Sequence, residues 1–256
     1  MIAALKGKTD LGRAWLIVLG VLIAALSSAA PALAQTVTLD LGDGGSSTGR
    51  IVQLVALTTV LSLVPGILVT VTSFTRIIIV LSFLRSAMGI QQTPPNVVLL
   101  SLALFLSGFV MAPTLQQAYN DGIEPLINER ISENEAVLRT VAPVHKFMRD
   151  HVRPQDLRLF MDMAKLPEPA NAADLPLRAL IPAFMISELR RAFEIGFLLF
   201  LPFLVIDMVV ASLIMSMGIV SLPPNVISLP FKLIFFVLID GWYMVAGSLV
   251  QSFGTL

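Results

Sequence analysis

Residues 217–226 read Met-Gly-Ile-Val-Ser-Leu-Pro-Pro-Asn-Val and lie between two long apolar runs. Residues 88–97 read Met-Gly-Ile-Gln-Gln-Thr-Pro-Pro-Asn-Val, so seven of the ten positions are the same in both stretches. In each stretch a glycine, Gly89 or Gly218, ends one apolar run. The Pro-Pro pair then begins the next run, because proline supplies a helical φ in the first turn, where no N–H partner is needed. The sequence therefore predicts an apolar helical hairpin that is present twice, as an internal repeat.

The composition is typical of an integral membrane protein. Hydrophobic residues make up 56% of the sequence and charged residues 13%, whereas soluble proteins average about 25% charged residues. The 17 basic and 17 acidic residues balance, which argues against a nucleic-acid-binding surface, since such a surface needs a basic excess. The sequence contains no cysteine, which excludes disulfides, thiolate catalysis and cysteine-ligated metals within it.

The N-terminal segment has the pattern of a secretory signal peptide. Three basic residues precede a short apolar run at residues 15–26, and an Ala-Leu-Ala sequence follows. We expect cleavage between Ala34 and Gln35, which makes residues 1–34 the signal peptide and residues 35–50 a polar, glycine-rich tether. The alternative is an uncleaved anchor, but the run is short for a spanning helix, which needs about 20 residues. Cleavage would place the mature N-terminus outside the cytoplasmic membrane of a bacterium.

The remaining chain divides by composition into two apolar blocks and a charged segment between them. The first block, residues 51–113, is interrupted by Pro65-Gly66 and carries Arg76, so we expect separate helical pieces with the arginine facing protein or water. Residues 114–182 contain ten acidic and eight basic residues and both histidines, which predicts a water-exposed helical domain. The second block is residues 183–256. The predicted fold class is all-α, with about four membrane spans.

Counting the predicted spans gives the topology. If the mature N-terminus lies outside, each block crosses the membrane and returns, both Pro-Pro-Asn turns face the cytoplasm, and the charged domain is periplasmic. The two repeats then share one polarity, unlike the inverted repeats of many secondary transporters, which weighs against a carrier. The sequence thus predicts a subunit of the bacterial inner membrane that has too few spans to enclose a wide channel unless it oligomerises.

The second block begins with four charged residues at helical spacing. Glu188 with Arg191, and Arg190 with Glu194, have the spacing of pairs along one helix. At a membrane boundary the same groups could instead bond between subunits.

Two further charges flank the second turn. Asp207 lies fourteen residues before Ser221, near the centre of the turn, and Lys232 lies eleven residues after it. An antiparallel hairpin brings them to a similar depth, so we expect a pair within or between chains. The alternative is that each charge is neutralised separately.

Amphipathic patterns indicate helices in the charged domain. Pro154 opens one helix that places Leu157, Phe160 and Met161 on one face, and Phe147 belongs to another apolar stripe. These stripes fit a small core. Phe147 and Phe160 could equally pack on a neighbouring subunit.

The sequence shows no catalytic arrangement. His145 and His151 are six residues apart, and no cysteine or carboxylate motif frames them as a metal site, so we expect both to be solvated. No Ser-His-Asp order, nucleophile elbow or nucleotide-binding loop can be placed in a supporting structural context. We therefore expect no enzyme activity, no cofactor and no metal.

The second block carries several distinctive motifs: Pro-Ala-Phe-Met-Ile-Ser-Glu-Leu-Arg-Arg-Ala-Phe at residues 182–193, Pro202-Phe203, Ile206-Asp207, the Met-Gly and Pro-Pro turn, Pro230-Phe231-Lys232-Leu233 and Asp240-Gly241-Trp242. These motifs resemble those of the FliP family, whose members are core subunits of the flagellar type III export gate. The likeness extends from about Val52 to the C-terminus, and the related virulence-secretion subunits of the SctR branch share most of it. The signal peptide and the tether favour the flagellar branch.

The resemblance implies an assembly of several copies with FliQ and FliR, near FlhA and FlhB, which forms a closed conduit for unfolded flagellar proteins. In that family the complex is a spiral lifted largely above the membrane plane, so the charged residues of the apolar blocks would be contacts between subunits. The residues expected in such contacts are Phe147, Phe160, Glu188, Arg191, Asp207, Lys232 and Asp240.

The family closes its pore with a methionine-rich loop at the second turn. The matching residues here are Met215, Met217, Gly218, Ile219, Val220, Ser221 and Leu222. The run after the glycine is Ile-Val-Ser-Leu rather than methionines, and β-branched side chains are stiffer than methionine, which seals irregular gaps. Position rather than composition therefore predicts the gate, and plain helix packing is the alternative for Met215 and Met217.

Two other functions are open at this point. A small-solute transporter or ion channel subunit should show polar groups that converge at mid-membrane from unwound helices, whereas the charges here are spread apart. A purely structural envelope scaffold is the third interpretation. Only the export subunit predicts a loss of filament and hook export with nutrient uptake intact.

Overall fold

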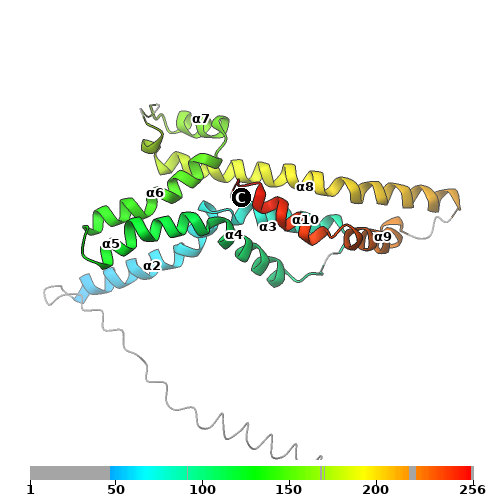
Figure 1. Ribbon diagram of the computed structural model, residues 1–256, viewed down its shortest axis with the longest axis horizontal. Helices are drawn as coiled ribbons and strands as arrows, with labels where there is room; N and C mark the ends of the chain where they lie inside the picture. Colours follow the sequence, from blue (N-terminus) through cyan, green and yellow to red (C-terminus); the bar gives the residue numbers. More distant parts are fainter. Residues whose placement is uncertain (1–46, 91, 168, 170, 219–222, 255–256) are drawn as a thin grey trace, which may run out of the picture. The chain divides into compact units, whose positions relative to one another are not determined.

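The computed structural model (Figure 1) describes residues 47–90, 92–167, 169, 171–218 and 223–254. The described part is helical throughout and contains no strand, so the predicted all-α class is confirmed. The predicted signal peptide, its cleavage site at Ala34 and Gln35, and most of the predicted tether lie outside the described residues. The elements are α2 (Ser47–Val71), α3 (Phe74–Ala87), α4 (Asn96–Ala118), a π-helix η1 (Tyr119–Ile123), α5 (Glu124–Ile127), α6 (Glu133–His151), α7 (Pro154–Met163), a 3₁₀-helix η2 (Ala172–Asp174), α8 (Leu177–Ser216), α9 (Pro224–Leu238) and α10 (Gly241–Gln251).

The two repeated stretches end their helices in the same way. Both α3 and α8 stop at a methionine cap, and the glycine that follows has a left-handed backbone, with φ of +77° at Gly89 and +71° at Gly218. Many helices end at a residue with this left-handed backbone, and glycine adopts it with the least strain because it has no Cβ. After each turn a helix begins at the Pro-Pro-Asn sequence, at Asn96 in α4 and at Pro224 in α9. The predicted glycine stops and proline starts are therefore confirmed.

The break predicted at Pro65-Gly66 is wrong. Helix α2 continues through both positions to Val71, and the chain breaks at Thr72 and Ser73 instead. An apolar helix tolerates a proline because a break there would leave more backbone N–H and C=O groups without hydrogen bonds in an apolar environment. Ser73 is fully buried at the break, where its hydroxyl lies 3.0 Å from that of Ser107.

Two helical stretches run through the boundaries expected at residues 113 and 182. Helix α4 passes through Pro113 and continues by way of η1 and α5 to Ile127, and α8 passes through Pro182 and Pro202 over 40 residues. At 1.5 Å per residue, α8 is about 60 Å long, about twice the 30 Å thickness of a bilayer's hydrocarbon core. One helix therefore links the charged segment to the second apolar block without a joint.

The number of spanning helices is smaller than expected. Within the described residues, two stretches are long and apolar enough to cross a membrane, Asn96–Ile127 and Leu177–Ser216. Helices α9 and α10 would count as a third span if taken together, although they are bent by 64°. Helix α3 has only 14 residues, so its half of the first hairpin is too short to cross alone.

Helix α3 lies at the centre of the core of residues 57–256. It packs against α8 and α4, and α8 also packs against α7 and α9. The side chains of Ile77, Val80 and Leu81 are almost completely buried there. The approach of α8 to α3 depends on Gly196, because a Cβ at that position would lie 2.6 Å from Cδ2 of Phe83.

Candidate functional site

A buried ion pair joins the two apolar blocks. Arg76 of α3 and Glu188 of α8 are 1% and 0% exposed, and two parallel bonds connect them, Nε to Oε2 at 2.8 Å and Nη2 to Oε1 at 2.5 Å. Two-point pairing of this kind fixes the relative orientation of the guanidinium and the carboxylate. Removing either partner would leave an uncompensated buried charge, which destabilises a fold far more than removing both.

The C-terminal residues complete the environment of this ion pair. Arg76 Nη1 donates to the backbone oxygen of Ser252 at 3.1 Å and to its hydroxyl at 2.9 Å. The guanidinium carbon lies 3.6 Å from the centre of the Phe253 ring, a cation–π contact. The ring of His151 of α6 lies 5.4 Å from that of Phe253, centre to centre, with its Nε2 3.2 Å from the Phe253 oxygen and its Nδ1 2.7 Å from the oxygen of Phe147. Helices α3, α6 and α8 and residues 252–253 thus meet around the guanidinium of Arg76.

A second ion pair ties the second hairpin to the first turn. Lys232 Nζ of α9 donates to Asp207 Oδ2 of α8 at 2.6 Å and to the backbone oxygen of Ala87 at 3.1 Å. The other carboxylate oxygen of Asp207 accepts from the buried Ser228 hydroxyl at 2.5 Å. Ala87 is the last residue of α3, where a cation is favourably placed against the unpaired carbonyls of the helix end. The predicted pairing of Asp207 with Lys232 therefore occurs within the chain.

The second turn presents its methionines outward. Met215 and Met217 are each 71% exposed, and the helix ends at the left-handed Gly218. The other residues expected in the gate, Ile219, Val220, Ser221 and Leu222, lie outside the described residues. Beside the turn, α8 and α9 enclose an almost wholly apolar groove of about 510 Å³, which Met217, Leu213 and Phe231 help to line.

Large apolar side chains cover the outside of the spanning stretches. Phe105 and Phe109 on α4, Phe197 on α8 and Leu238 on α9 are examples with more than half of their surface exposed. Continuous apolar surface on this scale requires a covering of lipid or protein. The structure therefore describes a chain whose exterior is suited to a membrane or to neighbouring subunits.

The remaining residues expected in subunit contacts have different environments. The Phe147 ring is buried within the chain against Phe184 and Phe253, so it has little surface left for a neighbour. Phe160 is partly buried in a small cluster around Met161. Asp240 is exposed and takes a left-handed backbone, φ 51°, at the bend between α9 and α10.

Two predictions about local polar partners need correction. Glu188 does not pair with Arg191 along α8 but with Arg76, because the arginine on α3 can bind both carboxylate oxygens in a dry site. The predicted Arg190–Glu194 pair does form, with Nε and Oε1 2.9 Å apart. The histidines are also not simply solvated, since His145 Nε2 lies 2.8 Å from the oxygen of Leu175 and His151 has the two backbone partners given above.

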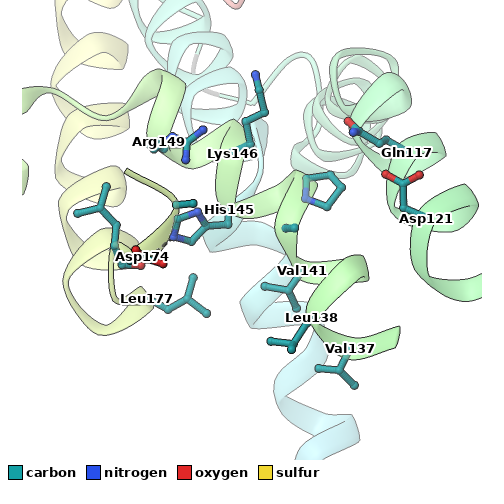
Figure 2. Close-up of a pocket in the computed structure, with 14 residues that line it drawn as sticks. Gln117, Asp121, Val137, Leu138, Val141, His145, Lys146, Arg149, Asp174 and Leu177 are labelled. Atoms are coloured by element: carbon teal, nitrogen blue, oxygen red, sulfur yellow. Dashed lines mark hydrogen bonds between the residues drawn. The ribbon is translucent and has the colours of Figure 1, made fainter. Parts of the chain in front are cut away.

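No pattern in the sequence indicates the cavity that lies beside α6. It has a volume of about 600 Å³ and lies between α6, the η1 region, η2 and the start of α8 (Figure 2). Figure 2 shows apolar side chains of α6 at its lower end, Lys146 and Arg149 at its upper end, and Asp174 and Asp121 on opposite sides of α6. The residues that make it come from five elements, α4, η1, α6, η2 and α8, and no local pattern would bring them together. Nowhere in the part of the chain that the structure describes do three or more His, Asp or Glu side chains group as metal ligands would.

Known proteins are similar to this chain over most of its length. The sequence model of the FliP family matches residues 57–249. The flagellar biosynthetic protein FliP of Caulobacter vibrioides is 57% identical over 245 residues, which cover 95% of this chain and 92% of that protein. Proteins of the same name from Bacillus subtilis and Aquifex aeolicus are 53% and 48% identical over 202 and 204 residues, or 79% of this chain and 91% and 85% of those proteins. The chain therefore belongs to the FliP family.

Proposed function

We propose that several copies of this chain surround a conduit through which unfolded flagellar proteins leave the cytoplasm. The chain is a flagellar export protein with helices able to span a membrane, and its relatives carry the name flagellar biosynthetic protein. The observation that carries the proposal is the combination of this family match with the exposed apolar faces of α4, α8 and α9. The two or three candidate spans of the described residues cannot enclose a pore for a polypeptide, so the conduit needs several copies.

The proposed partners are FliQ and FliR within the assembly and FlhA and FlhB beside it. The assembly would sit in the inner membrane at the flagellar basal body. The chain would act as a passive conduit there rather than as an enzyme, and would need no cofactor. Residues 114–182 would face the periplasm, and the two hairpins would be copies of one unit with the same polarity. The matching glycine turns at Gly89 and Gly218 support the repeat.

The proposed gate is the second turn, from Met215 to Leu222. Its support is the exposure of Met215 and Met217 at the end of a long helix, where side chains from several copies could converge. Flexible methionine side chains fill irregular gaps well. Replacing Ile219 and Val220 by glycine should make cells leak ions, because stiff apolar side chains would be lost from the constriction. Unchanged membrane tightness would count against this position for the gate.

Deletion of the gene in a flagellated host tests the proposed function. The deletion strain should secrete no hook or filament protein into the medium, and the gene on a plasmid should restore both. Uptake of labelled nutrients is the internal control, because it should be unchanged. Normal secretion in the deletion strain would refute the proposal, and a defect in solute uptake would point to a transporter.

A further inference from the structure

Two apolar surfaces lie on α6 and α7, which are not candidate spans, although the first surface also borders one end of each candidate span. Helices α6 and α7 are both rich in charged residues, and neither is among the stretches of the described chain that are long and apolar enough to cross a membrane. Yet Leu138 on α6 is 71% exposed and Met163 on α7 is 70% exposed. In a water-facing domain, apolar groups that gather in this way usually mark a contact with protein.

The first surface is the cavity of Figure 2, which we call the α6 groove. Val137, Leu138 and Val141 of α6, together with Leu177 of α8, form its apolar part. These side chains line about 600 Å³ of open space, which is wide enough to take side chains from a second helix.

The rim of the α6 groove carries charges of both signs. Asp121 and Asp174 come from elements on either side of α6, and Lys146 and Arg149 lie at the end opposite Val137 (Figure 2). A ligand that fits this rim must combine apolar groups with both a cation and an anion.

The second surface is the outer side of α7, which we call the α7 ridge. Leu159 and Met163 are one helical turn apart and exposed, while Met161 on the inner side is buried. Arg158 and Asp162 are also one turn apart and exposed. Arg158 lies beside Leu159 and Asp162 lies beside Met163, so the flank of this surface carries one positive and one negative charge. The α7 ridge thus has the apolar pair, the cation and the anion that the α6 groove requires.

We infer that the α7 ridge of one copy docks into the α6 groove of the next copy. In this contact Leu159 and Met163 cover Val137, Leu138 and Val141, and Arg158 faces one of the two aspartates that flank α6 while Asp162 faces Lys146 and Arg149. The inference rests on the proposed function, because it names the surface through which the proposed oligomer forms. The two surfaces differ, so the contact is head-to-tail and generates a ring or an open spiral rather than a closed pair.

Cysteine cross-linking in the full chain tests the contact, and the natural sequence has no cysteine to confuse the result. One copy carries Leu138→Cys and one affinity tag, and a second copy carries Leu159→Cys and another tag. Oxidation of membranes from cells that express both should give a disulfide-linked dimer with both tags. Each variant expressed alone should give no dimer, because neither residue meets its own copy in a head-to-tail contact.

A charge reversal provides the second measurement. Arg158→Glu in the Leu159→Cys copy should lower the yield of the mixed dimer, and Asp121→Lys with Asp174→Lys in the other copy should restore it. Arg139→Cys in place of Leu138→Cys is the matched control, since Arg139 is exposed on α6, does not line the groove and pairs with Glu135 rather than with a charge of the rim.

The outcomes separate this inference from the proposed function. An assembly of several copies that gives no mixed dimer, or a dimer from Leu138→Cys alone, overturns the head-to-tail contact but leaves the conduit intact. A chain that stays monomeric beside its neighbouring membrane proteins overturns both.

Discussion

Glu188→Gln is the substitution that most directly perturbs the buried ion pair. Glutamine keeps the shape of the side chain and one acceptor oxygen but removes the negative charge. The guanidinium of Arg76, 1% exposed, could then keep one bond to the amide oxygen, its two bonds to Ser252 and its contact with Phe253, but no negative charge would balance it. Leaving one partner of a buried ion pair uncompensated costs about 3 to 5 kcal/mol. In a chain of this size each kcal/mol lowers Tm by about 2 to 4 °C, so the expected decrease is about 6 to 20 °C.

The assay is thermal unfolding of the purified full chain in one detergent at a fixed heating rate. Glu194→Gln on the same helix is the matched control, because it breaks the exposed Arg190–Glu194 pair, which is worth about 1 kcal/mol or less. The double variant Arg76→Met with Glu188→Met should melt well above Glu188→Gln, since two apolar side chains leave no buried charge. If Glu188→Gln melted as high as Glu194→Gln, the ion pair would not stabilise the core in the way described here.

The other predictions concern the second ion pair and two glycines, and the same melting assay measures them all. Lys232→Met should lower stability by about 1 to 3 kcal/mol, because it leaves Oδ2 of Asp207 and the backbone oxygen of Ala87 without their lysine donor; a Tm equal to that of the parent would contradict the geometry. Gly122→Ala should destabilise by about 1 to 3 kcal/mol, because the new Cβ would overlap the α6 backbone and side chain at Thr140. Gly108→Ala, where a Cβ meets nothing within 4 Å, is its control and should change Tm little. Gly218→Ala should lose about 1 kcal/mol through its left-handed backbone alone, and Gly218→Asn should lose less.

Features set by neighbouring residues could be predicted from the sequence. The stops at Gly89 and Gly218 follow from backbone freedom at a single position, and the start of α7 at Pro154 follows from the fixed φ of proline. The pairing of Asp207 with Lys232 could also be predicted, because an antiparallel hairpin fixes which residues share a depth.

Features that join distant segments could not be predicted in this way. Local spacing favoured Arg191 as the partner of Glu188, but the better partner is Arg76, 112 residues away. Nothing in the sequence indicates that Lys232 also reaches the oxygen of Ala87, 145 residues away. Whether a proline breaks a helix is likewise decided by the surroundings of its backbone, which the sequence does not show. Proline positions alone therefore predict a break at Pro65-Gly66 rather than at Ser73.

The mass of the detergent-purified particle, with the chain expressed alone and then beside its neighbouring membrane genes, tests the proposed conduit most directly. We predict a particle that contains several copies of the chain and retains other small membrane proteins. A stable monomer or dimer that retains none would leave two or three spans with no pore, and would contradict the proposed conduit.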